Sequence, residues 1–282
     1  MQYRHIYHAG NFADVAKHVG LLYCLDALHR KPGAFFVLDS HAGRGCYDLQ
    51  APEAHKSGEA DRGVQRLIET RIGATPLAGY FAAIGARRGK RLGFYPGSPA
   101  LIAKRLRPQD RALFVELMPA EARAVEREIE SVGRVRTGIG DGYAALKAHL
   151  PPEERRGLVL IDPPYESMDE LKLMLLAFTD AYRRWPSGVF LIWYPIRSAT
   201  QRSLVHARFA SLKIPKMLFA DLAIYPDDAG VGLAGSGLMI VNPPFGADAF
   251  LCDAYGEIHR GIAAPGAGYV EVARLTPEQM PQ

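Results

Sequence analysis

Residues 157–165 read Gly-Leu-Val-Leu-Ile-Asp-Pro-Pro-Tyr, a short apolar run that ends abruptly in a turn. The apolar part predicts a strand over residues 157–162. The two adjacent prolines cannot continue a strand ladder or a helix, so they fix a rigid turn directly after it. This turn is expected to present Asp162 and an exposed Tyr165 at the end of the strand.

Apolar runs of this kind recur along the chain and alternate with segments of helical character. Strands are predicted over residues 34–39, 111–116, 135–139, 157–162, 188–194, 216–224, 237–242 and 268–274. Helices are predicted over residues 11–30, 99–107, 120–132, 142–149 and 168–185. Such alternation is typical of an α/β fold, in which helices cover both faces of a mostly parallel sheet.

Local signals mark the ends of two of these helices. Asn11 is a suitable N-cap for the first helix, and Lys31-Pro32-Gly33 ends it. In the helix over 120–132, Pro119 suits the first turn and Gly133 suits the end.

The connection between the first two strands is too long for an ordinary crossover, because about 70 residues separate them. We interpret residues 50–95 as an inserted, mainly helical subdomain, and the helix over 99–107 as the crossover proper. The whole chain, residues 1–282, is then expected to form a single domain that carries this insertion.

The composition is that of a folded protein, with 282 residues of which 48% are apolar and 23% are charged. No apolar run reaches the roughly 18 residues of a membrane span, and the first residues lack a signal-peptide core, so we expect a cytoplasmic protein.

The three cysteines are too far apart for a zinc or iron–sulfur motif. Residues 50–107 hold 11 Lys/Arg and four Asp/Glu. This basic stretch suits either nucleic-acid binding or an ordinary solvated surface.

Sheets of this kind bind ligands at the carboxyl ends of their strands, so the residues that follow each strand are candidate contacts. After the first strand, the segment Asp39-Ser-His-Ala-Gly-Arg-Gly45 lets a ligand approach the backbone or simply forms a tight turn. It lacks the third glycine of the dinucleotide fingerprint. Glu116, after the second strand, can accept the hydroxyls of a ribose or cap a helix. Asp141, after the third, can accept from an adenine amino group or cap the helix over 142–149.

The turn after residue 161 is the most specific of these signals. An adenine amino nitrogen is a poor nucleophile, because its lone pair is delocalised into the ring. The Asp162 carboxylate and the Pro163 carbonyl can both accept hydrogen bonds from it, which frees the lone pair for in-line attack on a sulfonium methyl. Tyr165 offers the base a stacking surface. The similar stretch Asn242-Pro-Pro-Phe245 comes too late in the chain, and we interpret it as a turn.

These four loops, in this order, resemble those of class I S-adenosylmethionine-dependent methyltransferases that act on amino groups. The N-terminal block Tyr3-Arg-His-x-x-His-Ala-Gly-Asn-x-Ala-Asp-Val-x-Lys-His18 closely resembles the opening of the RlmJ family, whose members methylate an adenine N6 in 23S ribosomal RNA. The resemblance spans essentially the whole chain, and Ile6 and Phe12 depart from it only at variable places. Further matches are His41-Ala-Gly43, Tyr95-Pro-Gly-Ser-Pro99, Glu116-Leu117, Gly140-Asp-Gly-Tyr143 and Ile161-Asp-Pro-Pro-Tyr165.

The resemblance implies a Rossmann-like class I methyltransferase sheet with a small helical insertion, and a role for each matched residue. Asp162 would be the catalytic acceptor, Pro163 and Tyr165 would bind the base, and Tyr3 would meet the RNA. The cofactor would be S-adenosyl-L-methionine, which leaves as S-adenosyl-L-homocysteine. The implied cofactor-binding residues are His18, His41, Ser98, Glu116, Asp141 and Gly142.

The resulting hypothesis is an adenine-N6 methyltransferase that acts on 23S ribosomal RNA as a monomer, without a metal or a membrane. The N-terminal histidines lack a carboxylate or cysteine that would complete a metal site. A DNA adenine methyltransferase is the first alternative, but only the insertion could serve for duplex recognition. A glutamine methyltransferase would be expected to carry Asn-Pro-Pro-Tyr. A non-catalytic RNA-binding module would be expected to lose Glu116 or Asp162.

Overall fold

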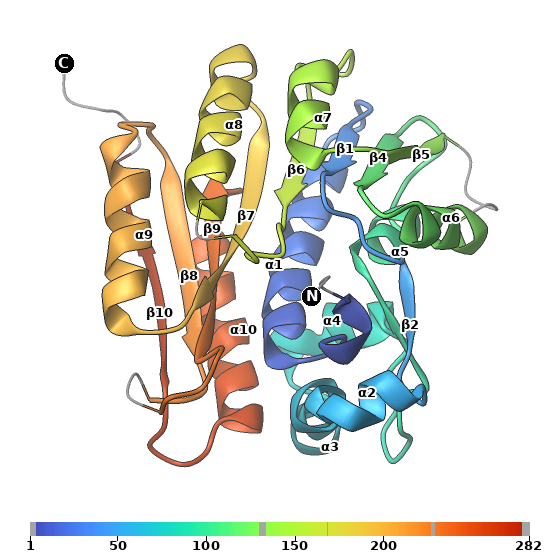
Figure 1. Cartoon of the computed structure of the whole chain (residues 1–282), viewed down its shortest axis with the longest axis vertical. Coiled ribbons are helices and arrows are strands. Elements are labelled where there is room, and N and C mark those ends of the chain that lie inside the picture. The colour runs from blue at the N-terminus through green and yellow to red at the C-terminus, as the bar shows by residue number, and fades with distance from the viewer. Residues whose placement is uncertain (1–3, 130–133, 168, 227–228, 278–282) are drawn as a thin grey trace.

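An eight-stranded sheet runs through the computed structural model, which describes residues 4–129, 134–167, 169–226 and 229–277 (Figure 1). Its strands lie in the order β10-β8-β9-β7-β6-β1-β4-β5. Their bounds are β1 Phe36–Asp39, β4 Arg111–Glu116, β5 Val135–Ile139, β6 Gly157–Ile161, β7 Val189–Ile196, β8 Met217–Ala223, β9 Gly235–Val241 and β10 Tyr269–Arg274. Each predicted strand is found to within two residues of its predicted ends.

Six of these strands run in the same direction. The pairings β5–β4, β4–β1, β1–β6 and β6–β7 are parallel. Strand β9 is antiparallel to both β7 and β8, and β10 is antiparallel to β8, so only β9 and β10 are reversed. This arrangement confirms the predicted mostly parallel sheet and brings the carboxyl ends of β1, β4, β5, β6 and β7 to one edge.

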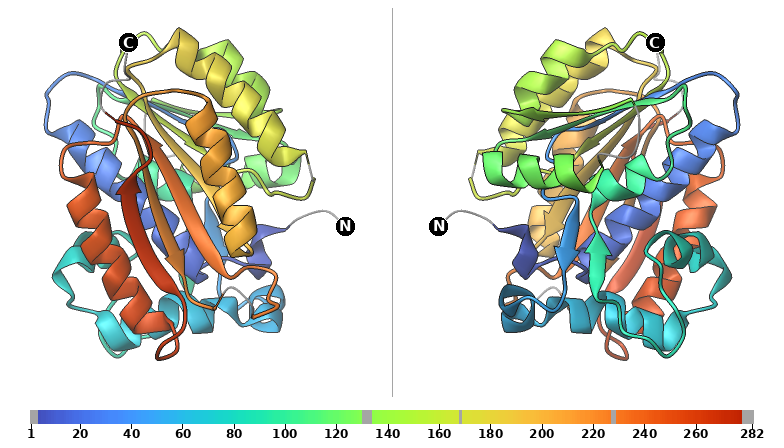
Figure 2. Two further views of the ribbon diagram at one scale, coloured as in Figure 1. Left: turned by 90° about the vertical axis from the view of Figure 1, so that its left-hand side faces the viewer. Right: turned by 90° about the vertical axis from the view of Figure 1, so that its right-hand side faces the viewer.

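Helices cover both faces of the sheet, as predicted (Figure 2). Successive strand residues point to opposite faces. Leu158 and Leu160 of β6 join one core cluster, whereas Val159 and Ile161 join the other. The first cluster lies under α1 (Phe12–His29), α5 (Ser98–Ala103), α6 (Pro119–Glu128) and α10 (Ala247–Ile262), and the second under α7 (Gly142–His149), α8 (Glu170–Arg184) and α9 (Ala199–Ser211).

Helix α1 is buried on nearly all sides rather than on a single face. Its N-cap is Asn11, whose side chain accepts from the backbone N–H of Asp14, as the sequence predicts. The helix packs on the sheet, on α5 and α10, and also on the insertion, so that little of its surface faces water. Three polar residues, Asp14, Lys17 and His18, are therefore buried with it. Buried charged groups require partners of opposite charge or hydrogen-bond partners. The partners of these three residues lie at the candidate site.

Three short helices lie between the first and second strands of the main sheet, within the predicted insertion. They are α2 (Pro52–Ser57), α3 (Arg66–Arg71) and α4 (Ala78–Ala83). An antiparallel ribbon of β2 (Cys46–Asp48) and β3 (Phe94–Pro96), which the sequence did not predict, joins the two ends of this segment. The crossover helix α5 is shorter than predicted and ends at Ala103. Arg107, which precedes Pro108, instead bonds the buried Asp110.

Helix α6 ends at Glu128, four residues before its predicted end at residue 132, and Gly133 lies outside the described residues. In the described part of the chain, no helix is long and apolar enough to span a membrane.

Candidate active site

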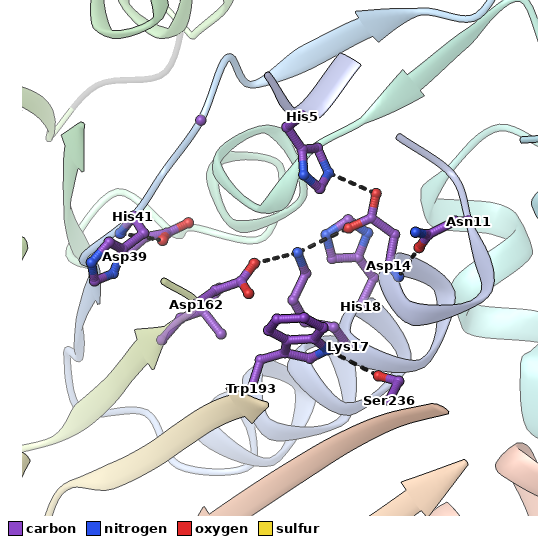
Figure 3. A network of polar contacts seen from close by, with 12 residues as sticks. His5, Asn11, Asp14, Lys17, His18, Asp39, His41, Asp162, Trp193 and Ser236 are labelled. Atoms are coloured by element: carbon purple, nitrogen blue, oxygen red, sulfur yellow. Dashed lines mark hydrogen bonds and ion pairs between the residues drawn. The ribbon is translucent and has the colours of Figure 1, made fainter. Parts of the chain in front are cut away.

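The loops after β1, β4, β5 and β6 meet at one edge of the sheet because these strands are parallel and adjacent. Helix α1 brings Lys17 and His18 to the same place, beside Asp162 (Figure 3). The structure therefore gathers His18, His41, Glu116 and Asp162 from segments far apart in the sequence.

A buried ion-pair chain runs from α1 to the turn after β6. The ammonium Nζ of Lys17 lies 2.5 Å from Oδ2 of Asp162 and 2.9 Å from Oδ1 of Asp14. Asp14 also accepts from Nε2 of His5, at 2.9 Å, and from the backbone N–H of Gly10, at 3.0 Å. The side chains of Asp14 and Lys17 are only 2% and 6% exposed, so each depends on the other for compensation of its charge.

The charges of this chain are well defined. Burial would raise the pKa of Asp14, but His5 and Lys17 hold it well below its usual value. Burial would likewise lower the pKa of Lys17, but Asp14 and Asp162 hold it well above its usual value. Asp14 is therefore a carboxylate and Lys17 an ammonium near neutral pH. With Asp162 ionised, the group carries one net negative charge, which favours a cationic ligand.

Both candidate histidines are neutral near neutral pH. Burial, with Lys17 beside it, lowers the pKa of His18 to about 3, and burial lowers the pKa of His41 to about 4. Nδ1 of His18 shares a hydrogen bond with the Tyr95 hydroxyl at 2.9 Å, and the two rings stack. The ring of His41 lies edge-on to Tyr143. Neutral imidazoles in fixed orientations can line a cofactor site without repelling a cation.

A second buried carboxyl group, that of Asp39, lies at the end of β1. Its Oδ1 accepts a long hydrogen bond of 3.4 Å from the backbone N–H of His41, while its Oδ2 is buried with no hydrogen-bond partner in the described structure. Burial raises the pKa of Asp39 to about 7, against the opposing effect of the Ser98 hydroxyl. Ser98 itself is buried at the first turn of α5. An unpaired hydrogen-bond acceptor in this position suits a ligand that carries a hydrogen-bond donor.

Glu116 ties two of the loops together. Its Oε2 accepts from the backbone N–H of Gly43, and its Oε1 accepts from that of Met118, both at 2.8 Å. It is therefore bound to loop backbone and does not cap α6, whose N-cap has no side-chain bond. Beside it, Leu117 and Ile139 are 67% and 56% exposed, which leaves apolar surface at the ends of β4 and β5. Exposed apolar side chains next to a carboxylate suit a nucleoside.

The loop after β5 is packed tightly against the loop after β1. Asp141 caps α7, with its Oδ1 accepting from the backbone N–H of Tyr143 at 2.8 Å. At Gly142, a Cβ atom would lie 2.0 Å from the carbonyl oxygen of Ser40 and 2.9 Å from Cε1 of His41. Glycine is therefore required here by the close approach of the two backbones.

The turn after β6 holds Tyr165 differently from the prediction. Pro163 is buried, and Tyr165 is half-buried rather than exposed. Its backbone has a left-handed φ of +51°, and its hydroxyl donates to the carbonyl oxygen of Trp193 at 3.0 Å. The ring thus turns back toward β7, where it meets the edge of the Trp193 indole. Tyr3 lies outside the described residues.

The similar stretch 242–245 is confirmed as a turn away from the site. Strand β9 is antiparallel to β7, so its carboxyl end lies beside the amino end of β7 at the opposite edge of the sheet. The Asn242 amide donates to the carbonyl oxygens of Pro186 and Gly188, both at 2.8 Å, and the Phe245 side chain is 93% exposed.

The N-terminal block packs on the insertion. Nδ1 of His8 lies 2.9 Å from the Glu59 carboxylate, and Asn11 donates to the same carboxylate at 2.9 Å. At Gly63 a Cβ atom would lie 2.3 Å from the carbonyl oxygen of Gly10, so the two segments touch through backbone. The insertion therefore helps to place the start of α1. In the part of the chain that the structure describes, no three His, Cys, Asp or Glu residues are grouped as metal ligands.

Comparison with known proteins decides the family. Residues 32–275 match the family model described as ribosomal RNA large subunit methyltransferase D, RlmJ. The chain belongs to the RlmJ family. The proteins named ribosomal RNA large subunit methyltransferase J from Haemophilus influenzae and Escherichia coli are 36% and 34% identical to it, over 99% of this chain and all of theirs. A Legionella pneumophila protein of known crystal structure is 30% identical, with a TM-score of 0.87 over 95% of this chain and 98% of that one.

Membership of the RlmJ family confirms the predicted enzyme class, the class I methyltransferase sheet and S-adenosylmethionine as cofactor. The residues at the site fit that cofactor. Its sulfonium and ammonium groups are cationic, and the ion-pair chain leaves a negative charge beside the unpaired Oδ2 of Asp39. Its adenosine suits Glu116 and the apolar surface of Leu117 and Ile139. The individual contacts of His18, His41, Ser98, Glu116, Asp141 and Gly142 with it remain predictions.

Asp14 and Lys17 had no predicted role. Both belong to the N-terminal motif. Their burial on a helix is the signal that would have marked them as candidate site residues. The contact of Lys17 with Asp162 joins positions 145 residues apart, which periodicity does not reveal. Trp193 was predicted only as part of the strand over residues 188–194, with no role at the site.

Proposed function

We propose that this enzyme transfers a methyl group to the N6 amino group of an adenine in 23S ribosomal RNA. The observation that carries the proposal is the fixed carboxylate of Asp162 at the end of β6, followed by the buried Pro163. The family's name, which specifies large-subunit ribosomal RNA, favours RNA over the DNA alternative.

The geometry of Asp162 suits an acceptor role. Lys17 holds its Oδ2, so the carboxylate has one orientation. Its other oxygen, Oδ1, is then free to accept from an amino group, together with the carbonyl oxygen of Pro163. Two acceptors on one nitrogen draw its lone pair out of conjugation with the ring. S-adenosylmethionine, when bound, supplies the electrophilic methyl group, and the protein supplies orientation and exclusion of water.

The remaining proposed roles follow from position. Tyr165 lies next to this amino-binding pair and offers its ring to the target base, and Tyr3 would contact the RNA. We assign the enzyme to the cytoplasm, where ribosomal RNA is made, and propose that it acts as a monomer without a metal.

The test is to incubate the purified protein with S-adenosylmethionine and, separately, with 23S ribosomal RNA, 16S ribosomal RNA, duplex DNA and protein. Nucleosides from each reaction are then identified by mass spectrometry. We expect N6-methyladenosine from 23S RNA alone, and none from an Asp162→Ala variant that still binds the cofactor. A methyl group on DNA, on protein or on another base would refute the proposal.

A further inference from the structure

Trp193 lies in the second half of β7, one strand away from Asp162. Strands β6 and β7 pair in parallel, with Ile161 opposite Ile192. Trp193 and Asp162 each come one residue later, so they occupy neighbouring positions on the two chains. The indole packs against the core cluster on the α1 face of the sheet, the face from which Lys17 reaches Asp162 (Figure 3). The residue is only half-buried.

Every polar group of this residue that could bind a ligand is already engaged. Its Nε1–H donates to the Ser236 hydroxyl on β9 at 2.9 Å, and Ser236 is 2% exposed. Its backbone carbonyl accepts from the Tyr165 hydroxyl at 3.0 Å. A tryptophan held in this way presents an apolar ring in a fixed orientation.

The two aromatic rings make a corner. The ring centroids of Tyr165 and Trp193 are 5.7 Å apart, and their planes are inclined by 68°. A planar ligand stacked on one ring would therefore touch the other.

The neighbouring residue of β7, Tyr194, is fixed from the other face of the sheet. The hydroxyl of Tyr194 donates to Asp221 at 2.6 Å and shares a hydrogen bond with His206 at 2.9 Å. A Cβ atom on Gly237 would lie 2.0 Å from the Tyr194 ring, so the two strands pack without a gap. Adjacent residues are thus anchored on opposite faces, which makes this part of β7 a rigid support.

We propose that Trp193 forms the second aromatic wall of the pocket for the target base, inclined by 68° to the ring of Tyr165, and that this pocket selects a base with an amino group. This inference rests on the proposed function and deepens it. Because the Trp193 N–H and the Tyr165 hydroxyl are engaged inside the protein, neither ring of the corner offers the base a side-chain donor. Hydrogen bonding then falls to acceptors, Asp162 and the Pro163 carbonyl. Acceptors bind the amino group of adenine and repel the carbonyl oxygen that replaces it in inosine.

The chain has two tryptophans, which gives a direct probe. Trp185 is 3% exposed and packs against Phe190 on the other face of the sheet. In a Trp185→Phe variant, all indole fluorescence comes from Trp193. With S-adenosylhomocysteine present, we expect adenosine monophosphate to quench it and inosine monophosphate to quench it at much higher concentration. In the matched Trp193→Phe variant, neither nucleotide should change the emission of Trp185.

Kinetics supply the second readout. Base stacking on an aromatic ring implies that Trp193→Leu raises the KM for 23S RNA by about tenfold or more, while the affinity for S-adenosylmethionine stays unchanged. Trp193→Phe should retain most of the affinity for RNA. Equal quenching by the two nucleotides would refute selection of the amino group. Absence of quenching, with an unchanged KM for RNA in Trp193→Leu, would refute the proposal that Trp193 forms a wall of the base pocket. In either case, N6-methyladenosine formed by the wild-type enzyme would leave the proposed function standing.

Discussion

At the scale of single residues, the buried ammonium of Lys17 determines the state of the site. It is the cation in contact with two carboxylates, one from its own helix and one from the turn after β6. The same contact fixes the orientation of Asp162 and keeps its charge compensated. A change at Lys17 should therefore affect stability and methyl transfer for separate reasons.

We expect Lys17→Met to lower the free energy of unfolding by about 3–5 kcal/mol, because it leaves buried carboxylates without a partner. Methyl transfer should fall by about a hundredfold or more, because Asp162 loses its orientation. Unfolding in urea and single-turnover assays measure the two effects. The double variant Lys17→Met/Asp162→Asn should regain part of the stability but none of the activity. Strictly additive losses in stability would show that the two side chains do not interact.

His18 links the site to pH. Its pKa is lowered to about 3 in the folded protein, against an ordinary value near 6.5. The unfolded chain therefore takes up a proton first as the pH falls, and stability is lost between about pH 6.5 and pH 3. Replacing it with Asn keeps a group that can bond the Tyr95 hydroxyl but removes the titration.

In that window, the stability of His18→Asn relative to wild type should rise by about 1.4 kcal/mol for each unit of pH decrease. Urea unfolding at pH 7, 6 and 5 measures it. If the two stability curves run parallel, His18 is not buried in its neutral form.

At the scale of elements, the approach of α7 to the loop after β1 is a point where a single methyl group should matter. We expect Gly142→Ala to push Ser40 and His41 away from the start of α7, because its Cβ would overlap the Ser40 carbonyl oxygen. Affinity for S-adenosylmethionine, measured by calorimetry, should drop by about tenfold or more.

Gly140 provides the matched control for this change. It lies in the same loop, but a Cβ atom there would have no atom within 4 Å. Gly140→Ala should therefore bind the cofactor as wild type does. Equal loss of affinity in both variants would show that loop flexibility, and not the close contact, is what glycine provides.

The elements that the sequence predicted best are those with strong local signals. Asn11 caps α1, and the apolar runs of β4 and β5 give their bounds without error. The ribbon of β2 and β3 was missed because each strand has three residues and depends on a partner about 50 residues away. The reversal of β9 depends on pairing as well. The residue types after β6 predicted Asp162 as a site residue. Its contact with Lys17, which orients it, could be found only in the three-dimensional structure.

At the scale of the whole molecule, the part of the basic stretch that belongs to the insertion lies at the end of the molecule away from α8 (Figure 1). Not all of its cations are equally available. Arg91 forms an ion pair with Asp61, and Arg88 donates to the carbonyl oxygen of Ile72 at 2.8 Å. Arg87 and Lys90 are exposed on the same segment. We propose that these two, more than their neighbours, contact RNA phosphates.

The double variant Arg87→Ala/Lys90→Ala should bind 23S RNA more weakly and with a smaller dependence on salt. Because each lost phosphate contact removes about 0.7–0.9 from the slope of log affinity against log salt, the slope should fall by about 1.5. Filter binding at several salt concentrations measures it. Lys172→Ala/Lys213→Ala removes the same charge from exposed positions on and near α8 and α9, and should leave the slope unchanged. Equal slopes in both double variants would mean that only net charge attracts the RNA and that the insertion makes no specific contact.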